Sequence, residues 1–179
     1  MVEAGCRDRP IFFVGPRACG KTTIGARLAR RMALPFEDTD ILLQRELDAN
    51  VAQIVAERGW EYFRERESSV LRETAARFAA GGVIATGGGM VLKRENRAFM
   101  RSAGRVFFLS VPVGALLARL AADPKETQRP PLTGLSSEAE AARILAEREP
   151  LYREAAHHVL DAACPPEEVC RKIFEILKY

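Results

Sequence analysis

Short apolar runs recur along the chain, separated by longer stretches in which apolar residues repeat every three or four positions. The short runs predict buried strands of a parallel sheet, and the longer stretches predict amphipathic helices. The predicted strands are residues 11–14, 34–37, 83–86, 105–110 and 157–160. The predicted helices are residues 21–32, 52–58, 61–80, 94–102, 113–121, 138–153 and 167–177. This alternation predicts an α/β fold with helices on both faces of a parallel sheet.

The length and one irregular segment refine this picture. A chain of 179 residues fits a single domain, here residues 1–179. Residues 123–135 fit neither pattern, because they combine three prolines and a glycine with charged residues. We expect a mobile surface loop there.

The charge and hydropathy patterns exclude several classes of function. Lys and Arg number 27 against 24 acidic residues, a net charge of +3, so the chain lacks the dense positive charge typical of nucleic-acid binding. Its longest apolar stretch, 106–118, is interrupted by Ser110, Pro112 and Gly114, and it is too short to cross a membrane. The first residues lack the pattern of a secretory signal. We expect a cytoplasmic protein that binds neither membranes nor nucleic acid.

The cysteines and histidines show no metal-binding pattern. Cys6, Cys19, Cys164 and Cys170 are scattered, without a CxxC pair, and reduced thiols are expected. The two histidines, His157 and His158, are adjacent in a predicted strand and lack zinc-ligand spacing, so we interpret them as structural.

Residues 15–22, GPRACGKT, match the phosphate-binding loop pattern GxxxxGK[ST]. They lie between a predicted buried strand and a predicted amphipathic helix, which is the context that the pattern requires. Loop N–H groups and the helix N-terminus would surround the β-phosphate, with Lys21 on the β and γ oxygens and Thr22 on magnesium. Ala18 and Cys19 are small enough for close approach to phosphate if φ is negative there. A redox thiol is the alternative interpretation of Cys19, but we favour packing.

Two carboxylates follow the second predicted strand, at the sheet edge where α/β proteins bind ligands. They are Asp38 and Asp40. Either could cap a helix beginning near Ile41. Beside a P loop, one acid would serve magnesium and the other would orient or deprotonate an acceptor hydroxyl, and Asp38 and Asp40 fit these roles.

Glycines and arginines mark a second binding element. Thr86 is followed by Gly87, Gly88 and Gly89, which indicates either close backbone approach to a ligand or a turn with positive φ. Arg64, Arg129 and Arg148 each interrupt a local pattern, and a guanidinium is the expected group for holding an anion. The residues alone therefore predict a kinase for a hydroxyl on a small, anionic molecule.

Taken together, these motifs resemble the shikimate kinase family over nearly the whole chain, particularly the second isoenzyme of enteric bacteria. The matching segments are residues 15–23, 38–40, 63–64 with Glu67, 85–89, 129–130, 132–134, and Arg148 with 151–153. The resemblance implies a P-loop NTPase fold of the nucleoside monophosphate kinase type, with a five-stranded parallel sheet. It also implies a substrate-binding segment at about 38–70 and a lid at about 123–135.

The same resemblance implies an activity and residue roles. The activity is ATP-dependent phosphorylation of shikimate in aromatic amino acid biosynthesis, with Mg²⁺. The residues implied to bind the phosphates of ATP are Ala18, Cys19, Gly20, Lys21, Thr22 and Thr23. Thr22 and Asp38 would serve the metal, and Asp40 would contact the acceptor hydroxyl.

Four further residues receive roles from the resemblance. Arg64, Gly88 and Arg148 would hold shikimate, with both arginines at its carboxylate. Arg129 would be the lid arginine over the transferring phosphoryl group, and Arg119 would lie under the adenine.

Two other functions fit parts of the pattern. A gluconate or nucleoside monophosphate kinase would share the P loop and lid, but the pair of acids and the glycine triplet argue against it. A non-catalytic ATP sensor would be expected to lack Asp40 or Arg129, and both are present. A monomer is expected, because no long exposed apolar stripe is evident.

Overall fold

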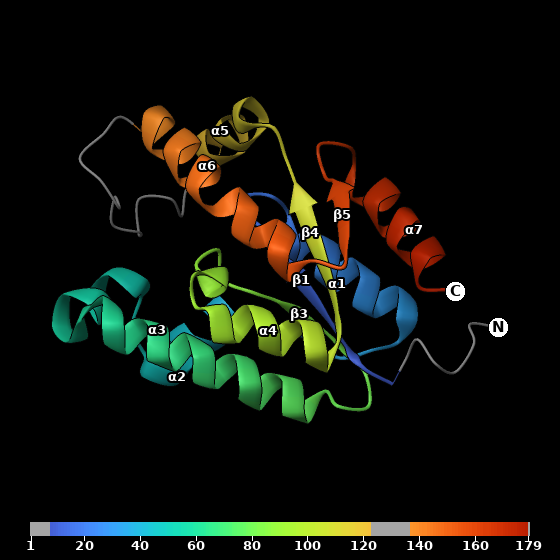
Figure 1. Cartoon of the computed structure of the whole chain (residues 1–179), viewed down its shortest axis with the longest axis horizontal. Coiled ribbons are helices and arrows are strands. Elements are labelled where there is room, and N and C mark those ends of the chain that lie inside the picture. Colours follow the sequence, from blue (N-terminus) through green and yellow to red (C-terminus); the bar gives the residue numbers. More distant parts are fainter. Residues whose placement is uncertain (1–7, 123–136, 179) are drawn as a thin grey trace.

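Five parallel strands form the centre of the molecule in the computed structural model, which describes residues 8–122 and 137–178 (Figure 1). The strands are β1 (Pro10–Val14), β2 (Phe36–Asp38), β3 (Gly82–Ala85), β4 (Arg105–Ser110) and β5 (His158–Asp161). Their order across the sheet is β2-β3-β1-β4-β5, and every neighbouring pair is parallel. The predicted five-stranded parallel sheet is confirmed.

Helices cover both faces of this sheet (Figure 1). They are α1 (Lys21–Met32), α2 (Thr39–Leu47), α3 (Val51–Arg77), α4 (Arg94–Ala103), α5 (Val113–Ala121), α6 (Ser137–Ala155) and α7 (Pro166–Ile176). Alternate side chains of β1 divide the core: Ile11 and Phe13 pack with α1 and α7, whereas Phe12 and Val14 pack with α3, α4 and α6. This two-sided burial explains why the strands are continuous apolar runs.

A smaller apolar cluster joins α2 to α3 at the β2 side of the sheet. It includes Leu43, Ile54 and Phe63, all buried, and it is separate from the two main clusters. Two separate helices were predicted over this part of the chain, and the break between them is confirmed: α3 consists of two helical parts that meet at a kink at Gly59, where φ is 81° and ψ is 168°. The second helix ends at Arg77 rather than residue 80.

The remaining boundaries match the predictions or differ from them by one or two residues. β2 begins two residues later than predicted and ends at Asp38, so this acid belongs to the strand end. α2 begins at Thr39, two residues before the predicted start. Such shifts follow from hydrogen bonding to neighbouring strands and from capping, which apolar periodicity does not report.

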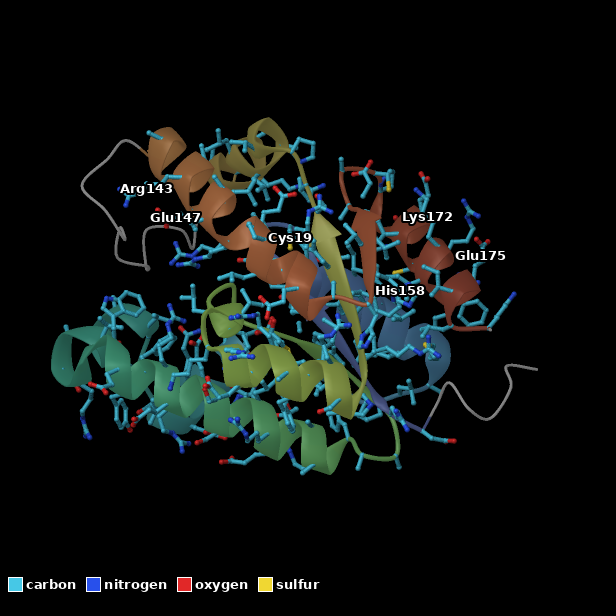
Figure 2. All side chains as sticks on the ribbon, in the orientation of Figure 1. Cys19, Arg143, Glu147, His158, Lys172 and Glu175 are labelled. Carbon is cyan, nitrogen blue, oxygen red and sulfur yellow. The ribbon has the colours of Figure 1, made fainter. Side chains whose placement is uncertain are left out.

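The histidine pair is structural, as predicted. His157 Nδ1 accepts a hydrogen bond from the backbone N–H of Val106 at 3.1 Å, and the His158 ring stacks on Phe107 with centroids 5.1 Å apart (Figure 2). Partial burial lowers the pKa of both imidazoles, with Arg105 contributing as a nearby positive charge. At pH 7, His157 is therefore a neutral hydrogen-bonding group and His158 a neutral packing group.

The outer helix faces carry ion pairs one turn apart. Arg143 pairs with Glu147 on α6, and Arg171 pairs with Glu175 on α7, at 2.8 and 2.9 Å (Figure 2). Such exposed pairs contribute little to stability, because water screens the charges. No helix in the described part of the chain is long and apolar enough to span a membrane.

Candidate active site

The P loop leaves the end of β1 and leads directly into α1. Its backbone turns through positive φ at Gly15 (147°), Ala18 (56°) and Gly20 (102°). Lys21 Nζ donates hydrogen bonds to the carbonyls of Gly15 and Pro16 at 2.9 and 2.7 Å. The loop is thus curved around its own lysine, which leaves N–H groups at the N-terminus of α1 to face an anion.

The condition of negative φ, under which Ala18 would allow close approach to phosphate, does not hold. Ala18 adopts the left-handed conformation, which costs an alanine roughly 1 to 2 kcal/mol relative to the right-handed form. A loop that turns its N–H groups inward alternates right- and left-handed residues, and this requirement overrides the preference of the side chain. Cys19, beside it, is fully buried under the loop, in keeping with a packing role (Figure 2).

A carboxylate and a hydroxyl meet beside the P loop. Thr22 Oγ1 donates to Asp38 Oδ2 at 2.5 Å, although the two residues lie 16 positions apart. The other oxygen, Asp38 Oδ1, accepts from the backbone N–H groups of Asp40 and Ile41 and so caps α2. The capping interpretation of Asp38 is therefore confirmed for one oxygen, and the other lies with Thr22 in an oxygen pair whose chemistry suits Mg²⁺.

Crowding, not backbone conformation, marks two glycines of the triplet, Gly87 and Gly89. None of Gly87, Gly88 and Gly89 has positive φ. Instead, a Cβ at Gly87 would collide with the carboxylates of Asp40 and Glu67, and a Cβ at Gly89 would collide with the guanidinium of Arg64. The alternative of a positive-φ turn is therefore wrong, and the close approach that glycine allows is made by protein side chains.

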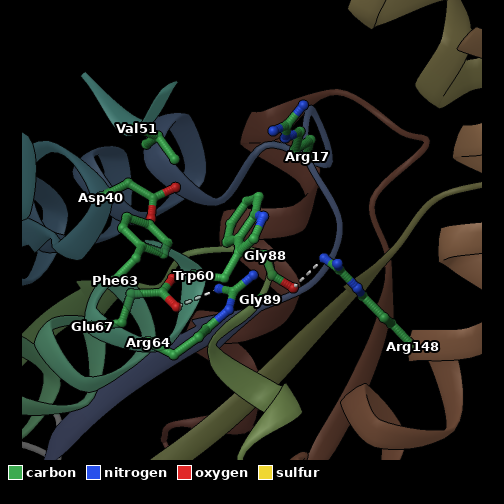
Figure 3. A pocket seen from close by; sticks show the side chains of 10 residues that line it. All are labelled: Arg17, Asp40, Val51, Trp60, Phe63, Arg64, Glu67, Gly88, Gly89 and Arg148. Carbon is green, nitrogen blue, oxygen red and sulfur yellow. Dashed lines mark hydrogen bonds and ion pairs between the residues drawn. The ribbon is translucent and has the colours of Figure 1, made fainter. Parts of the chain in front are cut away.

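One pocket brings together most of the predicted acceptor residues (Figure 3). Asp40 comes from α2, Arg64 from α3, Gly88 from the turn after β3, and Arg148 from α6. The other lining residues are Arg17, Val51, Trp60, Phe63, Glu67 and Gly89. Residues from four distant parts of the sequence thus converge at the carboxyl edge of the sheet.

Arg64 is held on several sides within this pocket. Its guanidinium forms an ion pair with Glu67 and lies 5.2 and 5.3 Å from the ring centroids of Trp60 and Phe63 (Figure 3). Burial raises the pKa of Glu67 to about 7. The Arg64 guanidinium lowers this pKa, but its effect is smaller than that of burial. Glu67 is therefore poised to change protonation near neutral pH.

The opposite wall of the pocket comes from α6. Tyr152 donates to the Gly88 carbonyl at 2.6 Å, and Arg148 Nη1 donates to the same oxygen at 3.4 Å. Tyr152 is almost fully buried and stacks on Phe108, and burial raises the pKa of its phenol. Tyr152 therefore fixes Gly88, while Arg148 extends into the pocket (Figure 3).

Arg119 lies on the nucleotide side of the site. From α5 it donates to the carbonyls of Ala18 and Cys19 at 3.3 and 3.4 Å and to Ala162 at 2.9 Å. It thereby joins the P loop to the turn after β5. The predicted lid, 123–135, and its Arg129 lie outside the described residues.

The sequence patterns missed several contributors to the site. Glu67 was recognised only as a matching residue, although its position three residues after Arg64 is typical of an ion pair on one helix face. Trp60 lies one turn before Arg64, which is a similar signal. The roles of Arg17 and Tyr152 had no sequence signal, because their contacts depend on the tertiary fold.

A parallel five-stranded sheet with a P loop after its first strand defines a P-loop kinase fold of the nucleoside monophosphate kinase type. The family model described as Shikimate kinase matches residues 17–178. A protein named Shikimate kinase 2 from Syntrophotalea carbinolica is 52% identical over 94% of this chain and 96% of its own. Its namesake from Yersinia enterocolitica is 51% identical over 93% and 94%.

Structural comparison agrees with the sequence matches. The structure of shikimate kinase from Acinetobacter baumannii in complex with shikimate aligns with a TM-score of 0.86 and 34% identity, over 94% of this chain and 92% of that one. The chain belongs to the shikimate kinase family. The resemblance predicted from the motifs is therefore confirmed.

Proposed function

We propose that this protein transfers the γ-phosphoryl group of ATP to the 3-hydroxyl of shikimate, forming shikimate 3-phosphate and ADP. The observation that carries the proposal is that a P loop and an acceptor pocket lie side by side at the carboxyl edge of the sheet. A P loop with Lys21 and Thr22 lies beside a pocket whose lining includes the Asp40 carboxylate and the guanidinium groups of Arg64 and Arg148. The names of the relatives support shikimate as the acceptor.

On the nucleotide side, residues 18–23 would bind the phosphates of ATP. Loop N–H groups and the N-terminus of α1 provide fixed positive dipoles. Lys21 would exchange its bonds to the loop carbonyls for the β- and γ-phosphate oxygens, where negative charge develops during transfer. Arg119 and Arg129 are the proposed contacts to adenine and to the transferring phosphoryl group.

The oxygen pair of Thr22 and Asp38 fits Mg²⁺. When bound, the ion would neutralise charge on the β and γ oxygens. The Thr22 hydroxyl would then act as a ligand, and the Asp38 carboxylate would hold the ion directly or through water, while its second oxygen continues to cap α2.

Asp40 would orient the acceptor hydroxyl and accept its proton as the oxygen attacks phosphorus. The new O–P bond forms as the bond from phosphorus to the bridging oxygen of ADP breaks. Arg64 and Arg148 would hold the carboxylate of shikimate, and Gly88 would allow the ring to approach the backbone. The acceptor would then lie between the guanidinium groups and the phosphate cradle.

An acceptor panel tests the proposal. Purified protein with MgATP and either shikimate, quinate, gluconate or a nucleoside monophosphate should release ADP mainly with shikimate, and phosphorus NMR should identify shikimate 3-phosphate. If ADP release were greater with gluconate or a nucleoside monophosphate, that compound would replace shikimate as the proposed acceptor. ATP binding without acceptor-dependent ADP release would favour the non-catalytic sensor. A cytoplasmic location and a monomeric state remain predictions.

A further inference from the structure

Hydrogen bonds behind the acceptor pocket join α3 to the glycine turn, residues 87–89. Ser68, one turn after Arg64 on α3, donates from Oγ to the Arg64 carbonyl at 2.9 Å. Asn96 Nδ2, from α4, donates to Ser68 Oγ at 3.0 Å and to the Met90 carbonyl at 3.2 Å. Met90 directly follows Gly89. The chain of bonds thus runs from the backbone of Arg64 to the end of the glycine turn.

The orientation of the Asn96 amide follows from its partners. The Met90 carbonyl can only accept, and Ser68 uses its hydroxyl proton on Arg64, so both need a donor. Asn96 is 2% exposed, and its Oδ1 has no hydrogen-bond partner in the described part of the protein. An unpaired buried carbonyl is unfavourable, and an apolar side chain would avoid it. The two donated bonds therefore provide the reason for an amide at this position.

We infer that Asn96 and Ser68 are positioning residues for the acceptor, setting where the Arg64 guanidinium lies relative to Gly88 and Gly89. This inference rests on the proposed role of Arg64. Arg64 packs so closely on Gly89 that a Cβ there would overlap the guanidinium. A small shift of α3 against the glycine turn therefore moves the anion-binding group directly. Displacements of this size in a binding site can cost large factors in activity.

Asn96→Leu is the decisive variant, because it removes both donors and the unpaired acceptor while keeping the same number of side-chain heavy atoms. It leaves the Met90 carbonyl and Ser68 Oγ without this donor, so we expect some loss of stability, while KM for shikimate rises roughly tenfold. KM for ATP and kcat should change less than about threefold, because the P loop is not involved. A residue that only supported the fold would lower stability without a selective loss of acceptor affinity.

Ser68 variants supply an independent test if Asn96→Leu does not fold. Ser68→Ala should raise KM for shikimate by a smaller factor than Asn96→Leu does. Ser68→Thr keeps the hydroxyl, so its KM for shikimate should stay near that of the wild type. Thr74→Val is the matched control, since Thr74 is a fully buried hydroxyl on the same helix whose side chain contacts Arg77 and not the pocket. Trp60 is the single tryptophan and lines the pocket, so its emission can report shikimate affinity without turnover.

Arg64→Ala separates this inference from the proposed function. If it raises KM for shikimate while Asn96→Leu and Ser68→Ala do not, the positioning role is wrong and the function stands. If Arg64→Ala itself leaves that KM unchanged, the proposed role of Arg64 fails and this inference fails with it. An equal rise in Thr74→Val would show general loosening of α3 and would also overturn the inference.

Discussion

Single residues at this site combine more than one role, and Asp38 shows how the roles can be separated. Asparagine caps a helix as well as aspartate does, so Asp38→Asn should keep α2 intact while weakening the metal site. We expect its kcat to recover in part as Mg²⁺ is raised. Asp40→Asn should instead lower kcat by two or more orders of magnitude at every Mg²⁺ concentration, because an amide cannot accept the hydroxyl proton.

Steady-state kinetics of both variants against Mg²⁺, with circular dichroism as the control for folding, would check this division. The roles are assigned wrongly if Asp38→Asn carries the whole loss with no change in its Mg²⁺ dependence.

Glu67 should make stability depend on pH. Its pKa is about 7 in the folded protein against 4.5 when unfolded, so between these values the folded state retains a proton that the unfolded state has released. The free energy of unfolding should therefore fall as pH rises from about 4.5 to about 7, by about 1 to 3 kcal/mol from this group. Glu67→Gln keeps an acceptor for Arg64 but cannot titrate, so this part of the slope should disappear. Urea unfolding at several pH values would measure it, and identical slopes in both proteins would contradict the assignment.

The kink in α3 shows how an element can depend on one residue. Gly59 has φ 81° and ψ 168°, a region in which other residues are strained. A Cβ there would meet no atom within 4 Å, so Gly59→Ala isolates the backbone cost, about 1 to 3 kcal/mol. Trp60 follows the kink and lies against Arg64, so KM for shikimate should also rise.

Gly114→Ala is the matched control for this prediction. Gly114 lies in α5 and likewise has no neighbour within 4 Å of an added Cβ, but its φ is ordinary for a helix. Alanine there should be neutral or stabilising by up to about 1 kcal/mol. Thermal unfolding and shikimate kinetics of the two variants would be compared. If the two variants changed stability and KM for shikimate equally, the kink would not require the backbone conformation that glycine allows at Gly59.

Apolar periodicity predicted each of the five strands, and each segment that it predicted to be helical forms a helix. It could do so because buried parallel strands and amphipathic helices have distinct patterns. It placed the break in α3 between residues 58 and 61, but it could not give the conformation of Gly59 or the start of α2 at Thr39. Both depend on dihedral angles and caps that appear only once neighbouring elements are placed. The P loop was found for the opposite reason, since its chemistry requires a fixed local spacing.

The site residues follow the same division. Local context predicted five of the site residues. Lys21 lies in the P-loop motif, Asp38 and Asp40 follow a predicted strand, and Arg64 and Arg148 each interrupt a local pattern. Asn96 and Tyr152 gave no such signal, since their partners lie elsewhere in the chain and their roles come from burial. The positive φ of Ala18 was not predicted, because the geometry of the whole loop outweighs the preference of one side chain.

At the scale of the whole molecule, the site has two halves that belong to different elements. In the proposed function, the nucleotide half comes from the P loop, α1 and α5, and the acceptor half comes mainly from α2, α3, the turn after β3 and α6, with Arg17 of the P loop also lining the pocket. A ligand that binds only the folded state stabilises it according to its affinity, by about 2.7 kcal/mol at a hundred times Kd. Each half should therefore be measurable separately through stability.

We predict that Lys21→Ala loses most of the stabilisation by MgADP and keeps that by shikimate, and that Arg64→Ala does the reverse. Removing a charge-assisted bond weakens affinity about ten- to a hundredfold, which would reduce a stabilisation of about 2.7 kcal/mol to between about 0.4 and 1.4 kcal/mol. For a chain of this size each kcal/mol shifts Tm by about 2 to 4 °C, so the loss is readily seen by thermal unfolding. Thr74→Val controls for lower intrinsic stability, because its ligand shifts should match the wild type. If either variant lost the stabilisation by both ligands equally, the two halves would not be separate binding sites, and the assignment of Lys21 to the nucleotide and Arg64 to the acceptor would have to be withdrawn.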